Sequence, residues 1–276
     1  MGPGARREHT LVPSEISSSP KTDDEDLLEE LGKRWPAIRV PGYWATLYQN
    51  CAQWAREVSA GPFWTEVRAR LPEWGAEYRR STGGVLLANP LPNFVGKGLD
   101  RIRSKTLGRC KRDAALRQTA LGAGGPPIPQ LSDLVRTRIS CKFLDGVDYL
   151  ASRLNDLGQA LGVQPERERL GRLEGYFAQH VTFRADVYYR FGGEVTPTRI
   201  DCEVQVATDL STRVWDAAHQ IYEGARDTAD EPAEWQWNPG DPRFVARQLG
   251  HMIHLADGLL VQLRDSVLVN KKESPS

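Results

Sequence analysis

Two carboxylates and a set of cations carry the chemistry that this sequence offers. Asp133 and Glu203 are hard oxygen ligands, the type that holds Mg²⁺ with the help of substrate phosphates. The positive charge that a triphosphate requires is available from Arg101, Arg103, Lys111 and Arg138. These residue types predict a site for a nucleotide–Mg²⁺ complex and phosphoryl-type transfer, in which positioning and charge neutralisation do most of the catalysis. The alternative is a sheet with ordinary salt-bridged charges on its solvent face, and spacing alone does not decide between the two.

Three alternating stretches are the elements that must position these side chains. Residues 135–143, 180–191 and 199–208 each alternate apolar and polar side chains, the pattern of a strand that buries one face. If the three strands share one sheet, its polar face carries Arg138, His180, Glu203 and Gln205 together. That face is the predicted site.

Helices flank these strands on both sides in the sequence. Apolar residues three and four apart predict amphipathic helices over 44–58 and 63–78, whose aromatic residues we interpret as packing. Further helices are expected over 147–161, after Thr208 or Asp209, and from Asp241-Pro242, where Val245 to Leu263 form an apolar stripe. Residues 164–174 are expected to be a charged loop. The order of elements predicts an α/β (α+β) domain, a mixed β-sheet with flanking helices.

The composition along the chain predicts the limits of the domain and the cellular environment. One domain is expected over 25–268, between disordered tails at 1–24 and 269–276, and the first tail is either passive or a regulatory arm. The four cysteines lie far apart without metal-site spacing, so we interpret them as free thiols in a reducing cytoplasm. No stretch approaches the roughly 18 apolar residues of a membrane span.

The charge is balanced overall but uneven along the chain. The 36 basic and 36 acidic residues give a formal net charge of zero, which argues against a globally basic nucleic-acid binder. Between Val95 and Lys142, however, 11 basic residues stand against 3 acidic ones. Such a block suits a polyanionic ligand, and the alternative is a solvated basic face.

Six short motifs occur in an order that resembles the synthetase domain of the RelA/SpoT alarmone synthetases. That family reads approximately R-x-K-S, a lysine eight residues on, D-I-A-G-x-R, G-Y-R-x-x-H, E-x-Q-x-R and H-x-x-Y. The matching residues are Arg101-Ile-Arg103-Ser104, Lys111, Asp133-Leu-Val-Arg-Thr-Arg138, Gly175-Tyr176 with His180, Glu203-Val-Gln205, and Trp215 with His219 and Tyr222. The resemblance covers roughly residues 94–222.

The resemblance implies a RelA/SpoT synthetase fold, which is nucleotidyltransferase-like, and a pyrophosphokinase that moves the β,γ-diphosphate of ATP onto the 3′-hydroxyl of a guanosine nucleotide. By position it implies that, for ATP, Arg101 and Arg138 sandwich the adenine while Arg103 and Lys111 hold the phosphates. Asp133 and Glu203 bind Mg²⁺, Glu203 also helps to deprotonate the attacking hydroxyl, and Gln205 joins them as the third catalytic residue. For the acceptor, Tyr176 stacks on the base while His180 and Gln205 contact the nucleotide.

Departures from the family pattern concentrate at the acceptor end. Arg103 replaces a lysine and Leu107 a serine, whereas Phe177 and Ala207 each replace an arginine. The donor half is therefore better preserved than the acceptor half, which leaves the acceptor open.

The resemblance leaves several functional alternatives. The chain lacks a His-Asp dipeptide and has too little sequence before Phe94 for a hydrolase domain, so a small, stand-alone, synthetase-only member is expected. The first alternative is a toxin that pyrophosphorylates the tRNA 3′-CCA end and has an antitoxin partner. The others are an enzyme that makes (p)ppApp and a degenerate nucleotide-binding module. A homo-oligomer is also left open.

Overall fold

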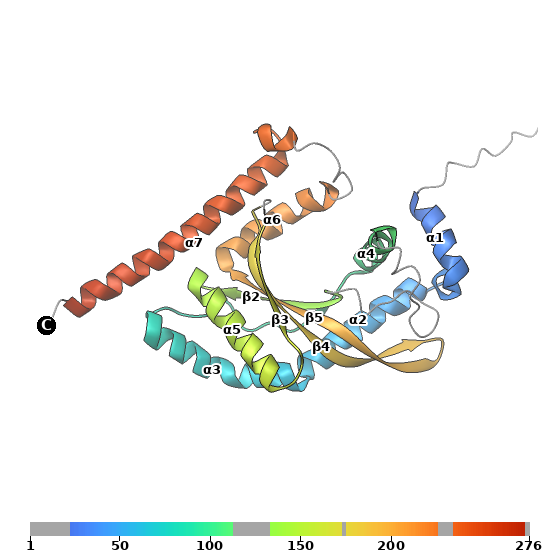
Figure 1. The fold of residues 1–276 in the computed structure, drawn as a ribbon, viewed down its shortest axis with the longest axis horizontal. Coiled ribbons are helices and arrows are strands. Elements are labelled where there is room, and N and C mark those ends of the chain that lie inside the picture. Colours follow the sequence, from blue (N-terminus) through green and yellow to red (C-terminus); the bar gives the residue numbers. More distant parts are fainter. Residues whose placement is uncertain (1–22, 113–132, 173–174, 226–233, 274–276) are drawn as a thin grey trace, which may run out of the picture.

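The computed structural model of the chain describes residues 23–112, 133–172, 175–225 and 234–273 (Figure 1). The elements in order are α1 (Asp23–Arg34), η1 (Pro36–Arg39), α2 (Tyr43–Ala60), α3 (Pro62–Thr82), β1 (Val95–Gly96), α4 (Leu99–Arg112), β2 (Val135–Cys141), α5 (Leu144–Ala160), β3 (Glu166–Gly171), β4 (Phe177–Phe191), β5 (Glu194–Thr208), α6 (Asp209–Ala225), η5 (Glu234–Trp237) and α7 (Pro242–Glu273).

The centre of the fold is one five-stranded mixed sheet in the order β1-β2-β5-β4-β3. β2 and β5 run parallel, and the other neighbouring strands are antiparallel. β4 and β5 form a long hairpin whose turn is Gly192-Gly193, with φ of +59° and +85°. Positive φ at both positions is the requirement of a tight two-residue hairpin turn, and glycine meets it without strain. The predicted mixed sheet with flanking helices is confirmed.

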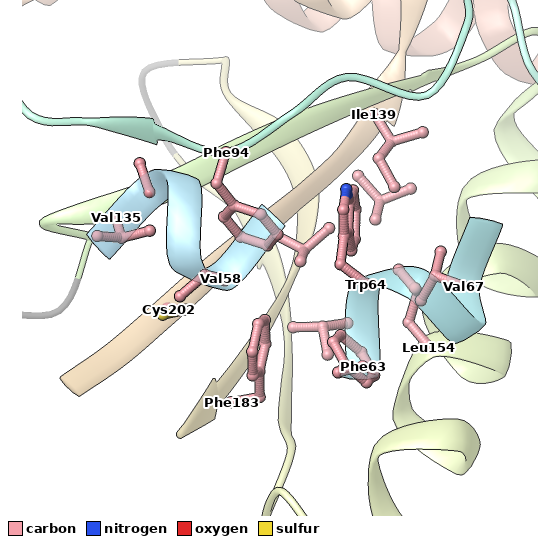
Figure 2. Packing of buried hydrophobic residues seen from close by; sticks show 14 of the residues in the cluster. Val58, Phe63, Trp64, Val67, Phe94, Val135, Ile139, Leu154, Phe183 and Cys202 are labelled. Carbon is pink, nitrogen blue, oxygen red and sulfur yellow. The ribbon is translucent and has the colours of Figure 1, made fainter. Parts of the chain in front are cut away.

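The apolar face of the sheet packs against α2, α3 and α5, which lie together on one side of it (Figure 1). Trp54 and Trp64 are fully buried there, and each indole N–H donates to a backbone carbonyl, that of Tyr188 at 2.9 Å and that of Pro92 at 3.2 Å. Figure 2 shows Phe63 and Trp64 of α3 against Phe94 and Phe183. The interpretation of these aromatic residues as packing is confirmed.

The structure differs from the sequence expectations at two places. The expected charged loop at 164–174 contains strand β3, which pairs antiparallel with β4 at the edge of the sheet. That strand lacks apolar alternation because its Arg167 and Arg169 bind the Asp148 carboxylate of α5. In addition, α5 begins at Leu144, three residues earlier than expected.

The expected tails have only partial counterparts in the structure. Residues 1–22 lie outside the described part of the chain, and Asp23 already belongs to α1. At the other end α7 continues to Glu273, past position 269 where a tail is expected to begin. Within the described ranges no helix has the length and hydropathy of a membrane span.

Candidate active site

The site is built around three residues that lie directly opposite one another on neighbouring strands, which we call a row. Arg138 of β2 lies opposite Gln205 of β5, and Gln205 lies opposite His180 of β4. Glu203 lies in the next row on the same face, because side chains two residues apart on a strand point the same way. The sequence prediction that these four residues share one face is therefore confirmed, whereas their chemical roles remain predictions.

Glu203 is held through both of its carboxylate oxygens. His180 Nδ1 lies 3.1 Å from Glu203 Oε2, and Gln205 Nε2 donates to Glu203 Oε1 at 2.6 Å. Burial raises the pKa of Glu203, but the hydrogen bonds from His180 and Gln205 and the charges of His180 and Lys105 outweigh it and lower that pKa to about 2. Glu203 is therefore a fixed negative charge over the whole neutral pH range.

His180 also connects Glu203 to Tyr176. The Tyr176 hydroxyl lies 2.8 Å from His180 Nε2, so one imidazole bridges the phenol and the carboxylate. The Tyr176 ring is buried and packs on Trp215 of α6, with 4.4 Å between ring centroids. Burial raises the pKa of Tyr176 to about 12, with Arg138 acting in the opposite direction. Tyr176 is thus a neutral hydroxyl at physiological pH.

Asp133 precedes β2 and binds two lysines. Lys97 Nζ lies 2.7 Å from Asp133 Oδ2, and Lys105 Nζ forms an ion pair with Asp133 Oδ1. The backbone at Asp133 has φ of +67°, a left-handed conformation that is uncommon outside glycine but tolerated by aspartate. Because Lys105 also lowers the pKa of Glu203, this one ammonium group acts on both carboxylates.

The two lysines were not among the predicted site residues, although both belong to the basic block seen in the sequence. Lys97 reaches Asp133 because β1 pairs with β2, and its backbone N–H donates to Leu134 at 2.8 Å. Lys105 reaches Asp133 because α4 buries Ile102, Thr106 and Cys110, which fixes the face that the lysine occupies. β1 is only two residues long, so periodicity in the sequence does not reveal that it pairs with β2.

The predicted ATP-binding cations do not all gather at these carboxylates. Arg138 Nη1 binds Asp216 of α6 at 2.6 Å, and its Nε donates to Gln205 at 3.2 Å. Arg101 is half-buried one turn before Lys105 on α4, and Lys111 is exposed near the end of that helix. Arg103 instead lines a hollow of about 460 Å³ with side chains of α1, η1 and α2, namely Leu28, Glu29, Ile38, Arg39 and Trp44.

The two positions that lack the family's arginines have different surroundings. Phe177 points to the other sheet face and stacks on His254 of α7, with centroids 3.8 Å apart and 5° between planes. Ala207 lies on the site face, buried with Tyr176 and Ala178. Positive charge is nevertheless present, because Arg136 and Arg172 lie close enough to lower the pKa of Tyr176. The His219 and Tyr222 side chains lie outside the described part.

Metal binding at this face depends on the two carboxylates. Among the described residues no group of three His, Cys, Asp or Glu side chains is placed to hold a metal ion. His251 and His254, three apart on α7, both pack on the Phe177 ring. Asp133 and Glu203 fit Mg²⁺ in the way that nucleotide enzymes use it, with one or two carboxylates and the rest of the shell from substrate phosphates and water.

Comparison with known proteins finds similarity in structure. No family model matches the chain, and no curated protein matches it by sequence. The chain is similar to solved structures of small alarmone synthetases. Small alarmone synthetase 1 from Bacillus subtilis is 12% identical, with a TM-score of 0.48 over 74% of this chain and 91% of that chain. The same protein bound to its product pppGpp gives 13% and 0.44 over 78% and 98%, and small alarmone synthetase 2 gives 15% and 0.43 over 77% and 98%.

Proposed function

We propose that the chain is a Mg²⁺-dependent pyrophosphokinase that transfers the β,γ-diphosphate of ATP to the 3′-hydroxyl of GDP or GTP. The observation that carries the proposal is a pair of carboxylates that share one cation: Asp133, just before β2, forms an ion pair with Lys105, and the charge of Lys105 also lowers the pKa of Glu203 on the sheet face. The same face carries Arg138, Gln205 and His180 in one row. The order of the sequence motifs supports the same assignment.

The proposed reaction breaks one bond of ATP and forms one bond to the acceptor. The 3′-oxygen attacks the β-phosphorus, the bond from that phosphorus to the α,β-bridging oxygen breaks, AMP leaves and the hydroxyl proton is released. Lys97, Lys105 and Arg138 supply positive charge for the phosphates, and fixed charges of this kind stabilise a transition state without reorganisation. Mg²⁺ held by Asp133 and Glu203 would add further neutralisation of phosphate charge.

Glu203 is better suited to binding a cation than to removing the proton. A general base works best when its pKa lies near the operating pH, and the pKa of Glu203 is about 2. Its two oxygens are also already oriented by His180 and Gln205. We therefore assign Glu203 to charge and metal binding, which revises the role in deprotonation that the resemblance implies.

The acceptor end favours a phosphorylated free nucleotide. Arg136 and Arg172 lie near Tyr176, so positive charge remains at the proposed acceptor end although Phe177 and Ala207 occupy two positions where the family has arginine. Tyr176 is the proposed base contact, with His180 and Gln205 beside it. A tRNA 3′ end is the second candidate, because the basic block between Val95 and Lys142 could follow a phosphate backbone.

Label transfer from ATP tests the proposal. Purified protein is incubated with γ-labelled ATP, Mg²⁺ and one acceptor at a time: GDP, GTP, ADP or deacylated tRNA. We expect labelled guanosine product and an equal amount of AMP. Label on tRNA or ADP alone would replace the acceptor, and ATP binding without AMP release would make the chain a nucleotide-binding module.

A further inference from the structure

Helix α3 and the segment that follows it form a groove that the proposed reaction does not use. Its volume is about 660 Å³, within the roughly 300–1,000 Å³ of ligand pockets in proteins. One wall consists of α3 side chains between Arg68 and Arg80, and the other is segment 85–87, which lies beside the end of β2. Because α3 packs on the apolar face of the sheet, this α3 groove lies across the sheet from the candidate active site (Figure 1).

The floor of the α3 groove is apolar and open. Seven small or apolar residues line it: Leu71, Pro72, Gly75, Ala76 and 85–87. Gly75 keeps the helix surface low, because among the described residues no atom outside the helix backbone lies within 4 Å of a Cβ added there. Val85 on the other wall is 49% exposed. An apolar side chain that enters the groove would therefore be removed from water against an apolar surface, which favours binding.

The other three lining residues are arginines, Arg68 toward one end of the groove and Arg79 and Arg80 toward the other. Arg68 donates only to neutral acceptors, the Ser59 carbonyl at 2.7 Å and the Asn93 side chain at 2.6 Å. In the part of the chain that the structure describes, no carboxylate forms an ion pair with Arg79 or Arg80. The groove thus carries three positive charges without a carboxylate partner.

The glutamates of α3 do not neutralise these arginines. Glu66 pairs with Arg70 one turn further along the helix at 2.6 Å, and Glu77 pairs with Arg153 of α5. Glu73 does not line the groove. The complementary occupant is therefore an anionic group, and charge complementarity of this kind gives an interface its specificity.

Backbone groups at the groove favour a peptide over other anions. Leu86 and Ala88 make backbone hydrogen bonds of 2.9 Å to the end of β2, so the N–H and C=O of Leu87 between them point away from that strand. On the helix wall Pro72 has no N–H to donate to the Arg68 carbonyl. An extended peptide can add its own backbone to an open strand edge, whereas a lipid headgroup would leave these groups unpaired.

The spacing of the arginines gives the length of the occupant. At 1.5 Å per residue, Arg68 and Arg79 lie about 17 Å apart along α3. An extended chain covers that distance in about five residues. We propose that the α3 groove binds an extended acidic segment of a partner protein, with apolar side chains on the floor and carboxylates against the arginines at both ends.

A designed peptide tests the groove. The probe is a fluorescent seven-residue peptide with glutamate at each end, leucine at the third and fifth positions and serine elsewhere. Fluorescence anisotropy with the full chain should show saturable binding at micromolar concentration, and the same peptide with lysine in place of glutamate should not bind. Arg79→Glu should weaken binding by about tenfold or more. Arg56→Glu, at an exposed arginine of α2 outside the groove, is the matched control and should leave binding unchanged.

Filling the groove is a second test that leaves the charges in place. Gly75→Trp should abolish peptide binding with unchanged circular dichroism, whereas Gly258→Trp, at an equally open glycine of α7, should not. Neither Arg79→Glu nor Gly75→Trp should change AMP release, so peptide binding and the proposed reaction can fail independently.

Three outcomes overturn the proposal. The first is no binding of the acidic peptide up to millimolar concentration. The second is binding that survives both Arg79→Glu and Gly75→Trp, which would place the peptide elsewhere on the chain. The third is flotation with phosphatidylglycerol vesicles that Arg79→Glu abolishes, without peptide binding, which would make the groove a lipid contact.

Discussion

At the scale of single residues, His180 joins two groups that the sequence keeps far apart. Its ring lies between the Tyr176 hydroxyl and the Glu203 carboxylate, so the proposed acceptor contact and the proposed metal ligand share one hydrogen-bonded chain. Alternation was enough to place His180 and Glu203 on one face. It could not predict Lys97 and Lys105, because their place depends on β1 pairing and on the packed face of α4.

Neutralising either carboxylate should stop turnover. Asp133→Asn and Glu203→Gln remove fixed negative charge from a face where charge placement carries the proposed catalysis, so kcat should fall by about 10²–10³ or more. AMP release from ATP plus GDP measures it. The matched control is Asp186→Asn, an exposed carboxylate paired with Arg199 on the β4–β5 hairpin, which should keep full activity. Undiminished AMP release by one of the site variants would remove that residue from the proposed chemistry.

Glu203 should also make the free energy of unfolding depend on pH over a defined range. Its pKa is lowered from 4.5 to about 2 on folding, so the stability it contributes is complete above about pH 4.5 and is lost as the pH falls toward 2. A shift of this size corresponds to about 3 kcal/mol. We expect the free energy of unfolding of the wild type, minus that of Glu203→Gln, to be constant from pH 7 to about pH 5. Below that it should shrink, and urea titrations at pH 7, 5, 4 and 3 measure it. A difference at pH 3 as large as at pH 7 would contradict the low pKa.

Tyr176 should govern the acceptor more than ATP. Stacking on a base contributes roughly 1–3 kcal/mol, so Tyr176→Ala should raise the acceptor KM by about one to two orders of magnitude with little change in the ATP KM. Tyr176→Phe keeps the ring and removes the hydroxyl that meets His180, so it separates stacking from hydrogen bonding. Steady-state kinetics with each substrate varied in turn measure both. An equal loss for ATP and acceptor would place Tyr176 in a purely structural role.

At the scale of elements, periodicity in the sequence predicts the strands and helices whose apolar residues face a common core. The strands β2, β4 and β5 alternate cleanly and were recognised, whereas β3 is an edge strand of charged residues that bind α5. The stripe on α7 was also visible in the sequence. Its exposure was not, because an apolar stripe looks the same whether it packs inside the chain or against another chain.

The contact between α7 and the Gly175 turn should be sensitive to one methyl group. A Cβ at Gly250 would collide with the Gly175 backbone, so Gly250→Ala should destabilise the fold by about 1–3 kcal/mol. It should also raise the acceptor KM, because Tyr176 follows Gly175 directly. Gly258→Ala is the matched control on the same helix. Among the described residues, no atom outside the backbone of α7 lies within 4 Å of a Cβ added there, so this change should stabilise the fold by about 0.5–1 kcal/mol. Urea denaturation midpoints measure both, and equal effects of the two changes would contradict the contact.

At the scale of the whole molecule, the charge is arranged as a local excess within a neutral chain. The net charge of zero gives no general attraction for polyanions, while the basic block brings Lys97 and Lys105 to Asp133 and Arg138 to the site face. Three of the eleven basic residues of the block are therefore placed at the site. This arrangement suits a small phosphorylated ligand better than a long nucleic acid.

The salt dependence of the reaction should reflect that arrangement. A protein that contacts 6–10 phosphates of a nucleic-acid duplex loses about 10³–10⁵ in affinity for it between 50 and 200 mM salt, because each phosphate contact releases counterions. A free nucleotide offers only its own phosphates, so kcat/KM for GDP should fall by less than about tenfold over that range. Initial rates of AMP release at fixed ATP and Mg²⁺, with GDP or deacylated tRNA as acceptor, measure the two slopes. Arg109, half-buried on α4 and outside the residues assigned to ATP or the acceptor, serves as the control. Its change to Ala should leave the GDP slope unchanged but flatten a tRNA slope. A steep loss with tRNA and no turnover with GDP would show that the basic block follows a nucleic-acid backbone, and would exchange the first candidate acceptor for the second.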